Sequence, residues 1–110
     1  EGVQNGILNK KSRAGRIVSL QPGLVTLRVP VRGKADREGN FPYLQMSLWN
    51  QDKQRLIATA YVLPEISEMA ASVKTAGGER WLEVELLNGS ASEKKEGPVV
   101  ELGPLEILSG

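Results

Sequence analysis

Two residue types on which many enzymes rely are missing from this chain. It contains no cysteine, which excludes disulfide bonds, thiolate zinc sites and a cysteine nucleophile. It contains no histidine, which removes the commonest general base, the usual metal ligand and the Ser-His-Asp triad. The only two aspartates, Asp36 and Asp52, stand in separate predicted loops and form no carboxylate cluster. We therefore expect a protein that is not an enzyme and that holds no metal and no cofactor.

Long apolar runs are also missing. No run approaches the roughly 18 residues that a membrane-spanning helix needs. The first 15 residues carry basic side chains but no apolar segment, so we expect no signal peptide. These absences predict a cytoplasmic protein that does not contact a membrane, and no motif indicates a small-molecule substrate.

What is present fits one small folded domain. The chain has 110 residues, of which 40% are hydrophobic and 25% charged, near the average for globular proteins. We expect residues 1–14 to be a flexible arm or the lead-in to the first strand. Residues 15–109 are expected to form a single domain.

Charge is unevenly distributed along the chain. The net charge is only +1, but residues 1–40 hold eight basic and three acidic side chains, and the remainder is net acidic. This asymmetry is typical of a basic face that meets nucleic acid or an acidic partner. Solvated lysines and arginines on an ordinary surface explain it equally well.

Alternation of apolar and polar residues predicts antiparallel strands along most of the chain. The pattern is clearest over residues 25–31, where valines and leucine alternate with Thr26, Arg28, Pro30 and Arg32. We read residues 33–42 as a long hairpin connection to the next strand. The strands are expected over residues 16–20, 25–31, 43–49, 55–63, 81–87 and 99–108, the last interrupted at Gly103-Pro104.

One segment changes period. Ile66, Met69, Ala70 and Val73 fall at helical spacing, behind Pro64, and this pattern predicts a short amphipathic helix over residues 64–74. An all-β, mainly antiparallel chain with a helix between its third and fourth barrel strands has the layout of an OB-fold. We therefore expect a five- to six-stranded OB-type barrel, in which closure removes bare sheet edges.

The arrangement resembles the bacterial single-stranded-DNA-binding protein family and its relative, the primosomal replication protein N family. The resemblance rests on the Gly-Arg-Ile-Val run at residues 15–18, the strand that ends in Leu48-Trp49, the predicted helix with its glycine break, and the terminal strand. It covers most of residues 12–109. It implies an OB-fold that binds single-stranded nucleic acid during DNA replication, DNA more than RNA, and that forms a homo-oligomer.

A non-specific single-strand binder needs cations for phosphates and flat rings for base stacking. We expect the outward faces of two hairpin-paired strands to supply Arg28 and Arg32 beside Tyr43 and Trp49, with Phe41 as a further ring. The predicted nucleic-acid-binding residues are Lys10, Lys11, Arg13, Arg16, Arg28, Arg32, Lys34, Arg37, Tyr43 and Trp49.

The other notable side chains have plainer interpretations. Trp81, which is followed by Leu82 and Glu83, is read as a packing residue at a subunit interface. Glu83 and Glu85 share one face of a predicted strand, and we read them as solubilising residues rather than as a catalytic pair.

A second reading belongs to another class of protein. The alternating strands suit a β-sandwich equally well, and the near-neutral net charge is unusual for a strong non-specific nucleic-acid binder. In this reading the chain is a protein-interaction or assembly domain that binds no nucleic acid. The predicted helix favours the barrel over the sandwich.

Overall fold

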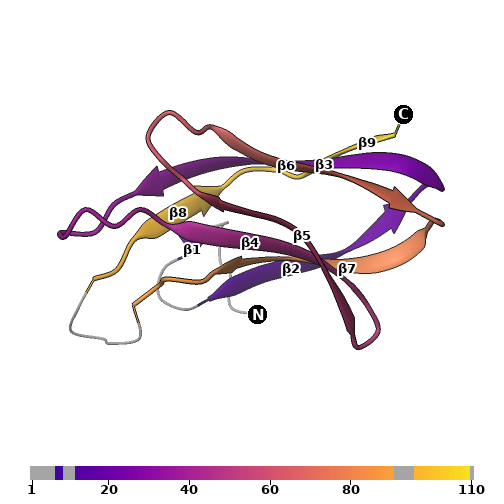
Figure 1. The fold of residues 1–110 in the computed structure, drawn as a ribbon, viewed down its shortest axis with the longest axis horizontal. Helices are drawn as coiled ribbons and strands as arrows, with labels where there is room; N and C mark the ends of the chain where they lie inside the picture. The colour runs from indigo at the N-terminus through magenta and orange to yellow at the C-terminus, as the bar shows by residue number, and fades with distance from the viewer. Residues whose placement is uncertain (1–6, 9–11, 91–95, 110) are drawn as a thin grey trace.

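A computed structural model describes residues 7–8, 12–90 and 96–109. These residues form two antiparallel sheets that face one another across the core (Figure 1). One sheet contains β2 (Arg13–Leu20), β7 (Gly78–Leu86), β4 (Tyr43–Asn50) and β5 (Lys53–Tyr61), in that order. The other contains β1 (Ile7–Leu8), β8 (Val99–Leu102), β3 (Gly23–Lys34) and β6 (Glu68–Thr75) in that order, with β9 (Glu106–Ser109) also paired to β3.

The core lies between the sheets and follows the predicted alternation. The inward residues of β3, which include Val25 and Leu27, are fully buried and face the inward residues of β4, which include Leu44 and Met46. Among the residues that the structure describes, the buried hydrophobic side chains are those of valines, leucines and methionines. Burial of their aliphatic side chains is the main favourable term that joins the two sheets.

The all-β antiparallel prediction is confirmed, but the closed barrel is wrong. β3 is hydrogen-bonded to β6 on one side and to β8 and β9 on the other, while β4 lies between β5 and β7. The two sheets therefore remain separate, and residues 33–42 cross between them instead of closing a hairpin. Within this crossing Asp36 Oδ1 accepts hydrogen bonds from the backbone N–H groups of Glu38 and Asn40 at 2.9 and 2.8 Å.

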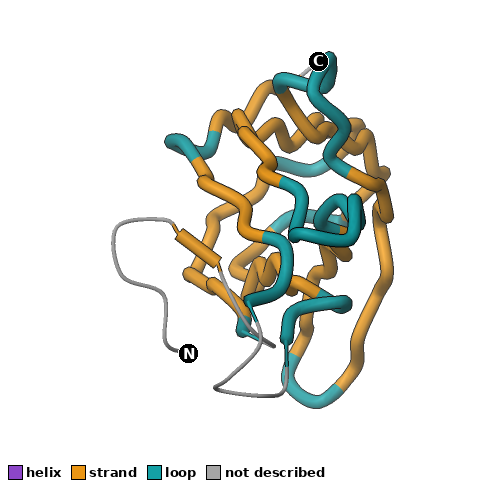
Figure 2. Tube along the Cα trace, turned by 90° about the vertical axis from the view of Figure 1, so that its left-hand side faces the viewer, coloured by secondary structure: helices purple, strands orange, loops and turns teal. Residues whose placement is uncertain are grey.

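The predicted helix over residues 64–74 is absent. Strand and loop account for all the described residues in Figure 2, and no helix among them could span a membrane. Met69 and Val73 are buried because they alternate with outward residues of β6, whose backbone pairs with β3 from Gly23↔Thr75 to Pro30↔Glu68. The spacing of Met69 and Val73 is compatible with one face of a helix and with one face of a strand. Backbone pairing with β3 decides for the strand.

The interruption of the last strand is confirmed. Residues 103–105 separate β8 from β9, and both strands pair with β3. Pro30 of β3 lies opposite this break, where its carbonyl accepts the Gly103 N–H at 2.8 Å. Proline has no backbone N–H to donate to a neighbouring strand, and here that missing hydrogen bond coincides with the break between β8 and β9.

Most of the predicted arm, residues 1–14, lies outside the described residues. Ile7–Leu8 pairs with β8 as β1, and Arg13 and Ala14 already belong to β2.

Candidate functional site

The outer face of the four-stranded sheet carries the most distinctive set of side chains in the molecule; we call it the aromatic face. Strand register places its residues in rows across β2, β7, β4 and β5. Their neighbours along each strand, such as Leu48 and Leu82, point into the core. In strand order the rows are Ile17, Trp81, Trp49 and Gln54; then Gly15, Glu83, Ser47 and Leu56; then Arg13, Glu85, Gln45 and Thr59; and finally Tyr43 beside Tyr61.

Aromatic residues are concentrated on this face. The chain has five aromatic side chains, and four of them, Trp49, Trp81, Tyr43 and Tyr61, lie here. None of the five belongs to the buried core. Large rings normally contribute strongly to a core. The placement of four rings on an outer sheet surface departs from that usual distribution.

Trp81 lies over the backbone of the neighbouring strand. A Cβ added to Gly15 of β2 would collide with the Trp81 indole, so only glycine leaves room for the ring in this position. The Trp81 side chain nevertheless remains 39% exposed. The indole is thus held close to the sheet with part of its surface open to solvent.

Polar side chains occupy the row beside the tryptophans. Glu83 is almost buried, and its carboxylate lies 3.6 Å from Arg13 Nη1 and 3.5 Å from the Nε1–H of Trp81, which donates to it. Ser47, directly across from Glu83, is buried and accepts a hydrogen bond from Gln54 Nε2 at 2.8 Å. These contacts fix the floor of the aromatic face.

The far end of the aromatic face is a tyrosine pair. The Tyr43 and Tyr61 rings have centroids 4.4 Å apart at an interplanar angle of 34°. Asn88 positions the start of β4, since its Oδ1 accepts the Tyr43 N–H at 2.9 Å and its Nδ2 donates to the Phe41 carbonyl at 2.8 Å. Tyr43 and Trp49 are six positions apart on the extended strand β4, a distance of about 20 Å.

The two central cations of the predicted nucleic-acid site, Arg28 and Arg32, do not come together with its rings. Arg28 and Arg32 lie on the outer face of the five-stranded sheet, whereas Tyr43 and Trp49 lie on the aromatic face of the other sheet. The prediction assumed that the two strands pair in one hairpin, and they do not. The sandwich therefore places the two sets of side chains on opposite surfaces.

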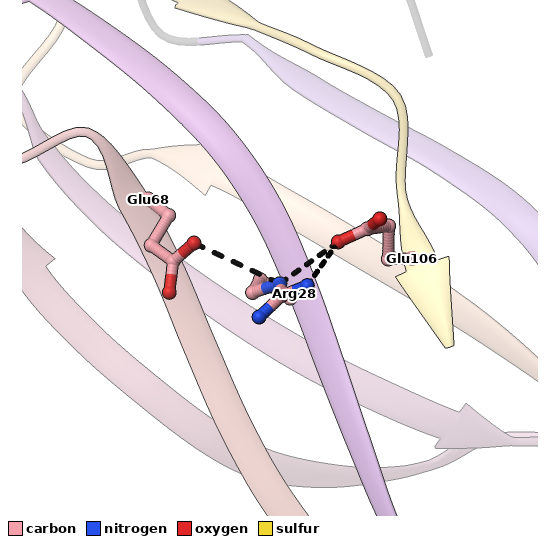
Figure 3. Close-up of polar contacts among 3 residues, drawn as sticks. All are labelled: Arg28, Glu68 and Glu106. Atoms are coloured by element: carbon pink, nitrogen blue, oxygen red, sulfur yellow. Dashed lines mark hydrogen bonds and ion pairs between the residues drawn. The ribbon is translucent and has the colours of Figure 1, made fainter. Parts of the chain in front are cut away.

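Arg28 is already paired within the protein. Its Nη2 and Nε donate to Glu106 Oε1 at 2.6 and 2.8 Å, and Nε lies 3.7 Å from Glu68 Oε1 (Figure 3). The hydrogen bond to Glu106, followed by the attraction of both carboxylates, raises the pKa of Arg28 above its ordinary value. Two carboxylates of the protein therefore already interact with the guanidinium that was predicted to contact a phosphate.

The remaining predicted contacts are scattered. Arg13 pairs with Glu83 on the aromatic face, and Arg16 lines an apolar pocket of about 220 Å³ at the open side of the sandwich, beside Leu102 and Leu105. The exposed side chains of Lys34 and Arg37 lie at the end of β3 and in the crossing loop. Lys10 and Lys11 fall outside the described residues.

Several residues of the aromatic face were missed at the level of sequence. Trp81 was read as a packing residue and Glu83 as a solubilising one, and Tyr61 fell within the predicted strand over residues 55–63 without any assigned role. The outward alternation of Trp81, Glu83 and Glu85 was visible, but nothing local indicated that β7 pairs with β4. Among the described residues, no group of three or more His, Cys, Asp or Glu side chains could hold a metal ion.

The fold has a counterpart among known structures. No family model matches the chain, and no curated protein matches it. A solved structure described as "CBM4 structure and function" matches with a TM-score of 0.60 and 12% sequence identity, over 94% of this chain and 81% of that chain. CBM4 denotes a carbohydrate-binding module with a β-sandwich fold.

This similarity overturns the resemblance to the single-stranded-DNA-binding and primosomal replication families. The matching fold is a sandwich from a carbohydrate-binding module and not an OB-type barrel. The predicted binding of single-stranded nucleic acid, the role in DNA replication and the nucleic-acid partner are therefore wrong. The expected homo-oligomer was implied by the same families and loses its basis with them.

Proposed function

We propose that this chain is a non-catalytic carbohydrate-binding domain whose ligand lies along the aromatic face. The observation that carries the proposal is the gathering of four of the five aromatic side chains on one outer sheet surface. The CBM4 match supports it through the shared sandwich fold.

The chemistry of the aromatic face suits a saccharide. A sugar ring presents an apolar C–H surface that packs against an aromatic ring, and the exposed part of the Trp81 indole offers such a platform. Tyr61, 56% exposed, offers a second platform at the other end. The separation of about 20 Å between the ends suits an oligosaccharide better than a single sugar.

Polar groups between the two platforms can meet sugar hydroxyls. Gln45 offers both donors and an acceptor, and Glu85, beside it, accepts. Thr59 completes this row on β5. In such a face, the rings at the two ends supply most of the affinity, and the hydrogen-bonding groups between them set the position of the ligand.

Intrinsic fluorescence tests this proposal directly, because both tryptophans of the chain lie on the aromatic face. Titration with a panel of oligosaccharides of different linkage is expected to change the emission saturably for at least one of them. Trp81→Ala is expected to weaken that binding by about tenfold, the effect of losing about 1.4 kcal/mol of ring contact.

The matched control is Leu108→Ala, which removes an exposed apolar side chain from the other sheet and is expected to leave the affinity unchanged. A wild-type protein whose emission responds to no saccharide, or a Trp81→Ala variant that binds as tightly as wild type, would contradict the proposal.

A second candidate function is protein binding through the same face. Ile17 and Leu56, each 56% exposed, lie on the two edge strands of the aromatic face, β2 and β5, and add aliphatic surface that a saccharide does not need. With the exposed rings between them, they widen the apolar surface of this face, and exposed apolar surface can mark a protein interface. Ile17→Ser separates the candidates, since it should impair capture of a protein partner and spare binding of a saccharide.

A further inference from the structure

A basic pocket lies at one end of the sandwich, where the β4–β5 turn approaches the β6–β7 connection; we call it the end pocket. Its volume is about 290 Å³. Four cationic side chains line it, Lys53 and Arg55 from β5, Lys74 from β6 and Arg80 from β7. Asn50 and Thr75 add neutral polar groups to the lining. In a chain with a net charge of +1, this is a marked local concentration of positive charge.

The two arginines of the end pocket are held by backbone carbonyls. Arg55 Nη1 donates to the Lys74 carbonyl at 3.0 Å, which links the two sheets. Arg80 Nη1 donates to its neighbour's carbonyl, that of Glu79, at 2.8 Å, and Nη2 donates to the Gly77 carbonyl at 3.3 Å. A guanidinium has five N–H donors, so each arginine keeps donors for a ligand while its position is constrained.

The four positive charges are not neutralised within the described part of the chain. None of the described acidic residues lines the end pocket, and none of their carboxylates forms an ion pair with any of the four. Arg13 and Arg28 show the contrast, since each of them has a glutamate partner. Like charges that share one pocket repel one another, and a bound anion would relieve that repulsion.

We propose that the end pocket binds a tetrahedral oxyanion, either sulfate or phosphate, free or as an ester. The cations reach the pocket from three strands of both sheets, and donors that approach from different elements suit a tetrahedral anion better than a planar carboxylate. A doubly charged anion also balances four cations better than a singly charged one. No ring lines the end pocket, so it lacks the stacking surface that bound nucleotides use.

The proposal does not depend on the carbohydrate-binding function. The end pocket and the aromatic face meet at Gln54, which lines the pocket and donates to Ser47 on the face. A ligand that carries a sulfate or phosphate ester could therefore reach both sites, and a free anion would occupy the end pocket alone.

The test is an NMR titration of the isotope-labelled protein at constant ionic strength. The probes are inorganic phosphate, inorganic sulfate and acetate, followed by galactose 6-sulfate against galactose. We expect saturable shifts for phosphate and sulfate at residues 50–55 and 74–80, and weaker shifts for acetate. Galactose 6-sulfate binding better than inorganic sulfate would identify an ester as the source.

The variant for this test is Lys53→Gln with Lys74→Gln, which changes two exposed side chains and keeps their stems. It is expected to weaken phosphate binding by about tenfold, as the loss of charge-assisted hydrogen bonds predicts. The matched control, Arg32→Gln with Lys34→Gln, removes equal charge outside the end pocket and is expected to bind like wild type.

Three results would overturn the proposal of an oxyanion site: chemical shifts that never saturate, shifts spread over the whole basic surface, or an equal loss of affinity in the Lys53/Lys74 and Arg32/Lys34 variants. The wild-type shift map decides the question even where a variant fails to fold. Tryptophan emission with neutral saccharides reports on the aromatic face separately, so failure of either proposal is distinguishable from failure of the other.

Discussion

Gly15 shows how a residue without a side chain shapes the candidate site. The Trp81 indole occupies the space that a Cβ at this position would fill, and the ring reaches Glu83 from there. The conformational freedom of glycine is not the reason, because Gly15 lies in the regular strand β2 and is not among the glycines with positive φ. The requirement is for space above the sheet.

Gly15→Ala is expected to displace the Trp81 indole while the sheet stays folded. The tryptophan emission should shift to longer wavelength as the ring becomes more exposed, and the saccharide affinity should fall as for Trp81→Ala. Ser19→Ala, on the same strand and the same side of the sheet, is the matched control and should change neither. An unchanged emission spectrum in Gly15→Ala would show that the indole does not lie on Gly15.

At the scale of single elements, β6 shows how tertiary pairing overrides local preference. Residues 69–71 read Met-Ala-Ala, which favours a helix by intrinsic propensity. In the structure Met69, Ala71 and Val73 face inward, and Ala70 lies outward opposite Arg28. β3 would otherwise expose an unpaired edge at this point, and pairing satisfies its backbone donors and acceptors.

Ala70→Thr distinguishes the strand from the predicted helix by the sign of its effect. In a strand a β-branched residue at this exposed position should raise the free energy of unfolding by up to about 1 kcal/mol. In a helix the same change should lower it by about half that amount or more. Urea denaturation measures the difference, and Ala76→Thr, in the connection after β6, serves as the control. A lowered stability would argue against β6.

At the scale of the whole molecule, one core joins both sheets. Leu27 of β3 is fully buried in it, facing the sheet that holds both tryptophans. Leu27→Ala should lower the free energy of unfolding by about 2–5 kcal/mol, a large share of the roughly 5–15 kcal/mol typical of such domains. Urea denaturation measures this loss, with the exposed Leu108→Ala as a control of small effect.

The same experiment tests whether the sheets unfold together. Tryptophan fluorescence reports on the four-stranded sheet, and far-UV circular dichroism reports on both sheets. Coincident transitions are expected, because neither sheet has a second core to hold it alone. Separate transitions would show that the sheets unfold independently.

The arrangement of the whole sandwich also predicts the behaviour toward nucleic acid. Arg28 and Arg32 lie on one outer surface and the aromatic face on the other. The cation of the aromatic face, Arg13, is paired with Glu83, so neither surface combines a group of phosphate contacts with base stacking. Fluorescence anisotropy with labelled oligo-dT should therefore show no preference over a duplex of equal length. A strong single-strand preference that falls steeply with salt would show that one surface does combine phosphate contacts with base stacking.

The sequence alone determined the features that depend on near neighbours. Alternation predicted the inward residues of β3 and β4, and Gly103-Pro104 predicted the break between β8 and β9. The lack of cysteine and histidine excludes disulfide bonds, thiolate ligands and imidazole groups. These features were accessible because side-chain period and turn chemistry are local properties of the backbone.

Only the tertiary structure decided which strands pair, and therefore which side chains share a surface. Alternation marks two faces on each strand but does not identify the strand beside it. β3 and β4 are consecutive in the chain and lie in different sheets, whereas Trp49 and Trp81 are far apart in the chain and lie side by side. Strand pairing depends on how both sheets bury their apolar faces in one core. This burial depends on the whole chain, so no local sequence pattern predicts it.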